Sequence, residues 1–181
     1  MKIKNTPLND CYIIEPTIFN DDRGYFYEKY NEAKFQELTG MNGHFVQDNI
    51  SKSSYGVLRG LHLQKGEHAQ AKLVSCLEGR VLDVAVDLRK NSSTFGKWFS
   101  IELSAENKVQ FYVPRGFGHG FSVLSETAVF AYKCDNYYNK ESEGGVLYND
   151  PDLQIDWNLP ESALILSDKD KIQPTFAEGN F

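Results

Sequence analysis

The chain has 181 residues, of which 41% are hydrophobic and 13% are aromatic. This length suits one domain over residues 1–181, and this composition supports a sizeable core and excludes global intrinsic disorder. The formal net charge of -6 at pH 7 argues against non-specific binding of nucleic acid, which depends on a basic surface. Any anionic ligand must therefore be held by a few well-placed cations.

The N-terminal stretch and the cysteines indicate where the protein works. The start MKIKNTPLND lacks the apolar centre of a signal peptide, and no apolar run approaches the roughly 18 residues of a membrane span. Cys11, Cys76 and Cys134 are far apart and lie among apolar residues, which indicates buried free thiols in a reducing compartment. We therefore expect a cytoplasmic protein with no membrane partner.

The first part of the chain predicts two strands and a helix. Residues 11–19 and 25–30 have the composition of strands, and the sequence DDRG between them is typical of a turn. Asn31 predicts the N-cap of a short helix over residues 32–39, and the glycine that follows predicts its end.

Strand-like runs then recur from residue 45 to 135, separated by turn signals such as LEGR and PRGFGHG. This spacing is typical of a β-sandwich, a jelly roll or a small barrel. In RVLDVAVDL (80–88), strict alternation places Asp83 on the face opposite Leu82. Periodicity alone fits a polar interior and a solvated outer face equally well for Asp83. The apolar pair in ESALILSDKD is expected to dock the C-terminal tail on the barrel.

Two of the four histidines lie in unusual settings. His62 stands in the otherwise apolar run GVLRGLHLQ, close to Arg59, and His119 stands in the glycine-rich turn PRGFGHGF. A histidine in an apolar strand is more often a satisfied core residue than a catalyst. Arg59 and the nearby Lys72 favour a functional role for His62. These three potential cations do not share a dry core without an acid or an anionic ligand.

The same histidines raise the alternative of a metal site. Metal centres in jelly rolls take a His-x-His pair, a glutamate and a further histidine, whereas the first motif here reads His62-Leu63-Gln64. His62 and His119 remain as plausible ligands, and zinc or iron needs three or four. The sequence therefore predicts no metal and no cofactor.

Three tyrosines and one aspartate are ambiguous on sequence alone. Tyr132 lies in the strand-like AVFAYKC, where a tyrosine is usually core, but a phenol pointing into a pocket opposite His62 has a proton to donate. Tyr137 and Tyr138 are adjacent, so we expect one in the core and the other as a stacking surface, in either order. Asp170 in LSDKD reads by itself as part of a solvated turn.

Several stretches together match a known family. They are FNDDRGYFYEKY (19–30), FVQDNISKSSYGVLRGLHLQ (45–64), AKLVSCLEGRVLDVAVDLR (71–89), PRGFGHGF (114–121), YKCDNYYNKESEGG (132–145), YNDPDLQIDW (148–157) and LSDKD (166–170). The chain resembles the dTDP-4-dehydrorhamnose 3,5-epimerases over nearly its whole length. The resemblance implies an all-β, cupin-type jelly-roll sandwich or barrel with a few short peripheral helices. It also implies a metal-independent homodimer, in which strands of one subunit complete the partner's nucleotide pocket.

The reaction implied by the resemblance is epimerisation of dTDP-4-dehydro-6-deoxy-D-glucose at C3 and C5, in dTDP-L-rhamnose biosynthesis. Both hydrogens are alpha to the C4 ketone, so removal of either leaves an enolate. The resemblance makes His62 the base, Asp170 its orienting partner, Tyr132 the proton donor on the opposite face and Lys72 the group that stabilises the enolate. Asp83 sits among these residues, in position to orient Lys72.

Further positions match residues that hold the substrate in the family. They are Arg23, Glu28, Gln47, Asn49, Arg59, His119, Tyr138, Glu143 and Lys169. Arg23 and Arg59 match diphosphate and nucleotide ligands, which a bidentate guanidinium suits. His119 matches a contact to the sugar or the diphosphate, and Tyr138 matches a platform for the base. Strict alternation puts Arg59 and His62 on opposite strand faces, so Gly60 is expected to mark a bulge.

Two alternatives remain open on the sequence. A mono-epimerase, acting at C3 or C5 only on a related dTDP-4-keto-deoxysugar, keeps the same base and donor. A metal-dependent dioxygenase or a non-catalytic sugar-binding protein shares the fold class. Metal analysis and proton exchange distinguish the members of this second group from an epimerase.

Overall fold

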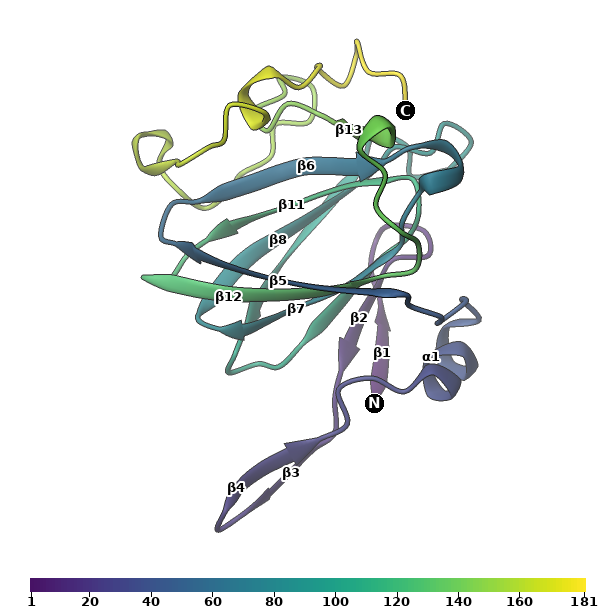
Figure 1. The fold of residues 1–181 in the computed structure, drawn as a ribbon, viewed down its shortest axis with the longest axis vertical. Coiled ribbons are helices and arrows are strands. Elements are labelled where there is room, and N and C mark those ends of the chain that lie inside the picture. The colour runs from purple at the N-terminus through teal and green to yellow at the C-terminus, as the bar shows by residue number, and fades with distance from the viewer.

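The computed structural model describes residues 1–181 and consists mainly of two facing antiparallel sheets (Figure 1). The six-stranded sheet contains, in spatial order, β1 (Lys2–Asn5), β2 (Tyr12–Glu15), β10 (Gln110–Val113), β7 (Lys72–Glu78), β12 (Thr127–Cys134) and β5 (Gln47–Ser54). The five-stranded sheet contains β13 (Glu143–Gly145), β6 (Leu58–Gln64), β11 (Phe117–Val123), β8 (Arg80–Asp87) and β9 (Trp98–Ser104). The predicted jelly-roll sandwich is confirmed.

Short helices lie outside the sheets, as expected. They are α1 (Glu32–Thr39) and the 3₁₀ turns η1 (Gly66–His68), η2 (Lys140–Ser142), η3 (Glu161–Ala163) and η4 (Asp170–Ile172). The limits predicted for α1 are confirmed. The side chain of Asn31 accepts a hydrogen bond from the Lys34 N–H, and Gly40 ends the helix in the left-handed region at φ 69°.

The single strand predicted over residues 11–19 is wrong. Pro16, which has no N–H to donate, lies between β2 and β3 (Ile18–Asp21) and divides the run. β3 pairs only with β4 (Gly24–Tyr27), and the predicted turn joins the two. This β3–β4 hairpin projects away from the two sheets (Figure 1).

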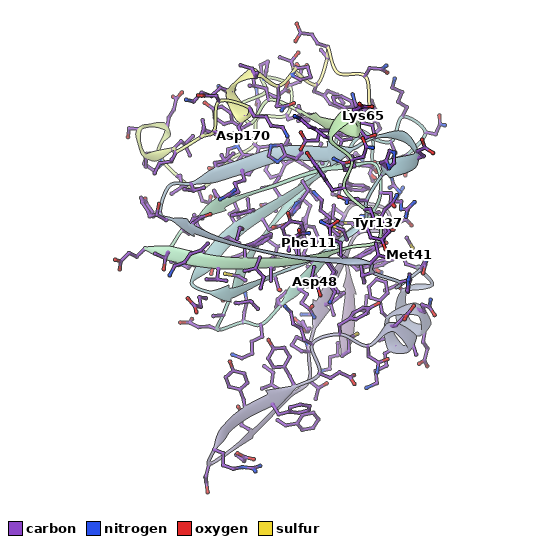
Figure 2. All side chains as sticks on the ribbon, in the orientation of Figure 1. Met41, Asp48, Lys65, Phe111, Tyr137 and Asp170 are labelled. Carbon is purple, nitrogen blue, oxygen red and sulfur yellow. The ribbon has the colours of Figure 1, made fainter.

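Apolar side chains of both sheets fill the space between them. Phe111 and Phe130 come from the six-stranded sheet, and Val81 and Ala85 come from the five-stranded sheet. Figure 2 shows Phe111 near the centre of the molecule. The core therefore lies between the sheets and holds them together by burial of apolar surface.

The strand β8 is buried on both faces. Leu82 and Val84 pack in a second cluster beneath the C-terminal segment, whereas Val81 and Ala85 face the opposite sheet. The predicted alternation is confirmed. Asp83 shares the inward face and has no exposed surface, so the interior alternative is the correct one.

The C-terminal segment returns to β6, as its apolar pair predicted. Leu164 and Leu166 pack against the second cluster, and Ile165 forms a parallel bridge with Val57 just before β6. This docking brings Asp170 beside β6, where Figure 2 labels it. A residue more than 100 positions away in sequence thereby reaches His62.

The cysteines and the helices bear on two further expectations. All three cysteines are free and buried, which confirms that prediction. None of the helices combines the length and the apolar character that crossing a membrane requires.

Candidate active site

Two adjoining cavities lie along β6 where it faces the six-stranded sheet, with volumes of about 460 and 350 Å³. His62, Lys72 and Tyr132 line both cavities and so mark their common boundary. His62 comes from β6 of the five-stranded sheet, while Lys72 and Tyr132 come from β7 and β12 of the six-stranded sheet. An imidazole therefore faces an ammonium and a phenol from the opposite sheet.

His62 is held by the carboxylate of Asp170. Its Nε2 lies 2.5 Å from Asp170 Oδ1, and Ser167 donates its hydroxyl to Asp170 Oδ2 at 2.6 Å. Burial on its own would raise the pKa of Asp170, but the hydrogen bonds from His62 and Ser167 outweigh burial and hold this pKa below its usual range. The ionised carboxylate places a proton on Nε2 of His62 and leaves the Nδ1 lone pair free.

Three polar atoms at the boundary have no hydrogen-bond partner within the protein. They are His62 Nδ1, Lys72 Nζ and Tyr132 Oη. Every buried side-chain polar atom of the chain has a hydrogen-bond partner, so these three atoms are accessible from the cavities. Burial lowers the pKa of Lys72, against the attraction of Cys134 and Asp83, and burial raises the pKa of Tyr132. The phenol therefore keeps its proton and can donate it.

His119 belongs to a second histidine–carboxylate pair. Its Nε2 lies 2.9 and 3.0 Å from the two carboxylate oxygens of Asp83. Burial lowers the pKa of His119, against the attraction of Asp83, and burial raises the pKa of Asp83. The bonded partner of Asp83 is His119, and no ion pair joins Asp83 to Lys72, so the expected orientation of Lys72 by Asp83 has no direct contact behind it.

Arg59 reaches the same cavity as His62 because the strand is irregular between them. The pairing of β6 with β11 shifts register between the partners of His62 and Arg59. Gly60 has φ +135° there, and a Cβ on it would lie 2.5 Å from the Cα of Gly120. Both side chains line the larger cavity, as expected from a bulge at Gly60. Ser53 accepts hydrogen bonds from the Arg59 guanidinium at 3.2 and 3.3 Å.

The smaller cavity collects most of the other expected ligand-binding residues. It is lined by Gln47, Asn49, Tyr138, Glu143 and Lys169. Lys169 forms an ion pair with Glu143, and this bond holds the pKa of Glu143 below its usual range. Gln47 donates to Asn49 Oδ1 at 3.0 Å.

The expected division of the adjacent tyrosines into one core residue and one surface residue is wrong. Tyr137 and Tyr138 are 66% and 53% exposed, and neither belongs to a core cluster. The chain leaves β12 at Cys134, so the alternation of a strand no longer sends one of the two inward. Tyr138 still lines the smaller cavity with its ring available to a planar ligand.

Two expected ligand-binding residues lie away from both cavities. The side chain of Arg23 is 89% exposed at the tip of the β3–β4 hairpin, where it pairs with Asp21. Glu28 follows the hairpin and bonds Lys34 at 2.7 Å. Neither residue lines either of the two cavities.

Some site residues escaped the sequence analysis. Ser167 has a local signal, because a serine three residues before an aspartate often bonds it within one turn. Ser53 and Gln70 have none, since the place of Ser53 comes from strand pairing and Gln70 lies in the segment before β7. No group of three or more His, Cys, Asp or Glu is placed to hold a metal ion.

The chain is similar in sequence to known proteins of one family. A family model described as dTDP-4-dehydrorhamnose 3,5-epimerase matches residues 5–178. The dTDP-4-dehydrorhamnose 3,5-epimerase of Escherichia coli K12 is 54% identical over 94% of this chain and 92% of its own length. The chain belongs to this family.

Solved structures of the family have the same fold. The crystal structure of dTDP-4-dehydrorhamnose 3,5-epimerase from Elizabethkingia anophelis has a TM-score of 0.98 and 77% identity, covering 100% of this chain and 99% of that one. The 3,5-epimerase from Legionella pneumophila in complex with dTDP-4-keto-L-rhamnose has a TM-score of 0.93 and 52% identity, covering 97% and 93%. A 3'-monoepimerase from Streptomyces bikiniensis is more distant, at 34% identity and a TM-score of 0.88, covering 96% and 87%.

Proposed function

We propose that this protein epimerises dTDP-4-dehydro-6-deoxy-D-glucose at C3 and C5, giving dTDP-4-dehydro-L-rhamnose. One observation carries the proposal: a base on one sheet faces a phenol on the other across a shared cavity boundary. A sugar ring between the two sheets presents one face to His62 and the other to Tyr132. Inversion at carbon needs this arrangement, because the proton leaves one face and returns to the opposite one.

The first step is abstraction of a proton alpha to the ketone. His62 Nδ1 takes the proton, and the electron pair of the C–H bond moves to the C4 oxygen as an enolate. Asp170 stabilises the imidazolium that forms, since its carboxylate accepts the Nε2–H at 2.5 Å. A neutral imidazole suits this task, because its free ring nitrogen can accept the proton.

The second step returns a proton from the opposite face. Lys72, which has no partner within the protein, stabilises the enolate oxygen until Tyr132 donates its phenolic proton to carbon. The turnover leaves His62 protonated and Tyr132 as phenolate, so exchange of both groups with water restores the starting state. The same cycle serves C3 and C5, because both carbons are alpha to the C4 ketone.

The β3–β4 hairpin supports a homodimer with shared sites. Phe19, Tyr25 and Phe26 are exposed on it, which is unfavourable for an isolated chain in water. Arg23 at its tip is a diphosphate-binding position of the family and has no phosphate-binding cavity in its own chain. We infer that the hairpin packs on a second copy and brings Arg23 to the partner's cavity.

Deuterium incorporation tests the reaction and its positions. The protein is incubated with dTDP-4-dehydro-6-deoxyglucose in deuterated water, and deuterium is counted at C3 and C5 of the product. We expect one deuteron at each carbon with inverted configuration at both. Deuterium and inversion at one carbon alone would make the protein a mono-epimerase, and the absence of exchange would make it a binding protein.

Mixed dimers test the shared site. Arg23→Ala and His62→Ala chains are co-expressed with different tags, and the doubly tagged dimers are isolated. With shared sites, each mixed dimer keeps one intact site and regains about half of the wild-type activity per dimer. With independent sites, every site carries one defect and mixing restores nothing.

A further inference from the structure

Asp83 is a buried carboxylate that the proposed chemistry does not use. It has no exposed surface, and it faces the space between the sheets from the middle of β8. Both of its carboxylate oxygens lie within 3.0 Å of His119 Nε2, and it has no other hydrogen-bond partner. A carboxylate in such a place is unfavourable unless a charge or a donor compensates it.

Titratable groups near Asp83 come from three elements. His119 lies on β11, Lys72 and Cys76 lie on β7, and Cys11 lies in the segment before β2. Burial raises the pKa of both thiols, so neither carries charge near neutral pH. No ion pair joins Asp83 to Lys72, so the donor that compensates Asp83 is the Nε2–H of His119.

The His119 ring is oriented by this carboxylate. With Nε2–H donated to Asp83, the other ring nitrogen keeps its lone pair. Nδ1 has no hydrogen-bond partner within the protein. Because every buried side-chain polar atom has a partner, Nδ1 is accessible from the larger cavity, which His119 lines. A neutral ring with a free lone pair accepts a hydrogen bond from a hydroxyl group and is poorly suited to a phosphate oxygen.

We propose that Asp83 is a positioning residue for the epimerisation: its carboxylate fixes the His119 ring with Nδ1 as an acceptor for a sugar hydroxyl. This inference rests on the proposed function. It assigns His119 to the hydroxyl groups of the sugar rather than to the diphosphate.

The substitution Asp83→Asn tests the role, with Asp87→Asn as the matched control. The asparagine keeps the shape of the side chain and removes the charge. Asp87 lies on the same strand, is equally buried and bonds Arg89, Ser92 and Thr94 outside both cavities. Loss of either carboxylate lowers thermal stability, so the comparison separates folding from catalysis.

For Asp83→Asn we expect kcat to fall about tenfold or more, with dTDP affinity within about threefold of wild type. Asp87→Asn keeps the wild-type kcat. If Asp83→Asn has the kcat of wild type, the positioning role is wrong.

A measurement on the unmodified protein keeps the test decisive should Asp83→Asn fail to fold. Nitrogen-15 NMR of the histidine rings reports which nitrogen of His119 carries the proton. We expect the proton on Nε2 and a lone pair on Nδ1 between pH 6 and pH 8. A proton on Nδ1 would mean that Asp83 is a neutral acid donating to Nε2, which overturns the proposal. Wild-type turnover in the same preparation shows separately whether the proposed function holds.

Discussion

His62 and His119 lie directly opposite each other on the paired strands β6 and β11, and each points Nε2 at a different carboxylate. Asp170 reaches His62 from the C-terminal segment, and Asp83 reaches His119 from β8. The surroundings of the two pairs differ. The side chain of His62 is 34% exposed, whereas that of His119 is 7% exposed.

This difference in burial separates the roles of two chemically similar pairs. An imidazolium at His62 forms beside water and an ionised Asp170, so a proton can come and go during turnover. An imidazolium at His119 would form in a site where burial lowers the pKa of the ring. The exposed pair therefore suits proton transfer, and the buried pair suits a fixed hydrogen bond.

The substitution His62→Ala should abolish exchange of the C3 and C5 protons and leave dTDP affinity largely intact. His62 supplies the free lone pair at the cavity boundary on its sheet, and no other group there replaces it. Deuterium incorporation and calorimetric titration of dTDP measure the two effects. His68→Ala is the control, because His68 lines neither cavity and its loss should change neither quantity. Residual exchange near the wild-type rate would assign the base elsewhere.

The substitution Asp170→Asn should lower kcat by about 10³-fold or more without loss of the fold, by analogy with the orienting acid of catalytic triads. An amide neither stabilises the imidazolium nor fixes the proton on Nε2. Ser167→Ala removes one hydrogen bond to Asp170 and should lower kcat only about three- to tenfold. Steady-state kinetics of both variants show which substitution lowers kcat more. A rate for Asp170→Asn within about threefold of wild type would show that Asp170 has a structural role and does not orient the base.

Asp170 also makes stability depend on pH in a definite direction. Its pKa lies lower in the folded protein than in the unfolded chain, so its stabilisation is present above the unfolded pKa. That stabilisation is lost as the pH falls through the folded pKa. We expect the gap in melting temperature between wild type and Asp170→Asn to be largest near neutral pH and to shrink below about pH 4. A gap that widens in acid would contradict this sign.

The parts of the fold with local signals could be predicted from the sequence. The limits of α1 follow from the cap at Asn31 and the left-handed glycine at position 40, which act over a few residues. The two faces of β8 follow from its alternation, although periodicity alone did not say whether the face that carries Asp83 meets water. The outcome depends on the six-stranded sheet, which packs against the face of β8 that carries Asp83.

The parts of the site that depend on distant segments could not be derived from local patterns. Asp170 meets His62 only because the C-terminal segment docks on β6. The resemblance to the family predicted the pairing of His62 with Asp170, which local sequence patterns did not. The bonded partner of Asp83 is His119, 36 positions away on a neighbouring strand, rather than Lys72. Arg23 and Glu28 lie away from both cavities of their own chain, so their expected roles depend on the proposed homodimer.

The substitution Gly60→Ala should destabilise the protein by about 2–5 kcal/mol, through overpacking and an unfavourable backbone conformation. The new Cβ meets the Gly120 backbone, so β6 and β11 must separate where Arg59 and His62 are set into one cavity. We therefore expect kcat to fall as well as the melting temperature. Gly66→Ala is the control: that glycine also has positive φ but nothing within 4 Å of its Cβ position. It should lose about 1 kcal/mol and keep its activity.

The substitution Tyr132→Phe should separate proton exchange from inversion. His62 still removes the proton, because the phenol takes no part in that step, and Lys72 still stabilises the enolate. The aromatic ring is retained, so little packing is lost. Without a donor on the far face, the enolate takes its proton back from His62 with retention of configuration. Deuterium then enters C3 and C5 of recovered substrate while the yield of inverted product falls by about 10²-fold or more.

The measurement compares deuterium content with configuration for the Tyr132→Phe variant and for wild type at matched times. Normal inversion by the variant would show that water or another group donates the proton and would leave Tyr132 a packing residue. Loss of both exchange and inversion would mean that the substrate is misplaced or that the enolate no longer forms. A dTDP titration separates these two causes: weakened binding indicates misplacement, and unchanged binding shows that the hydroxyl of Tyr132 also contributes to the abstraction step.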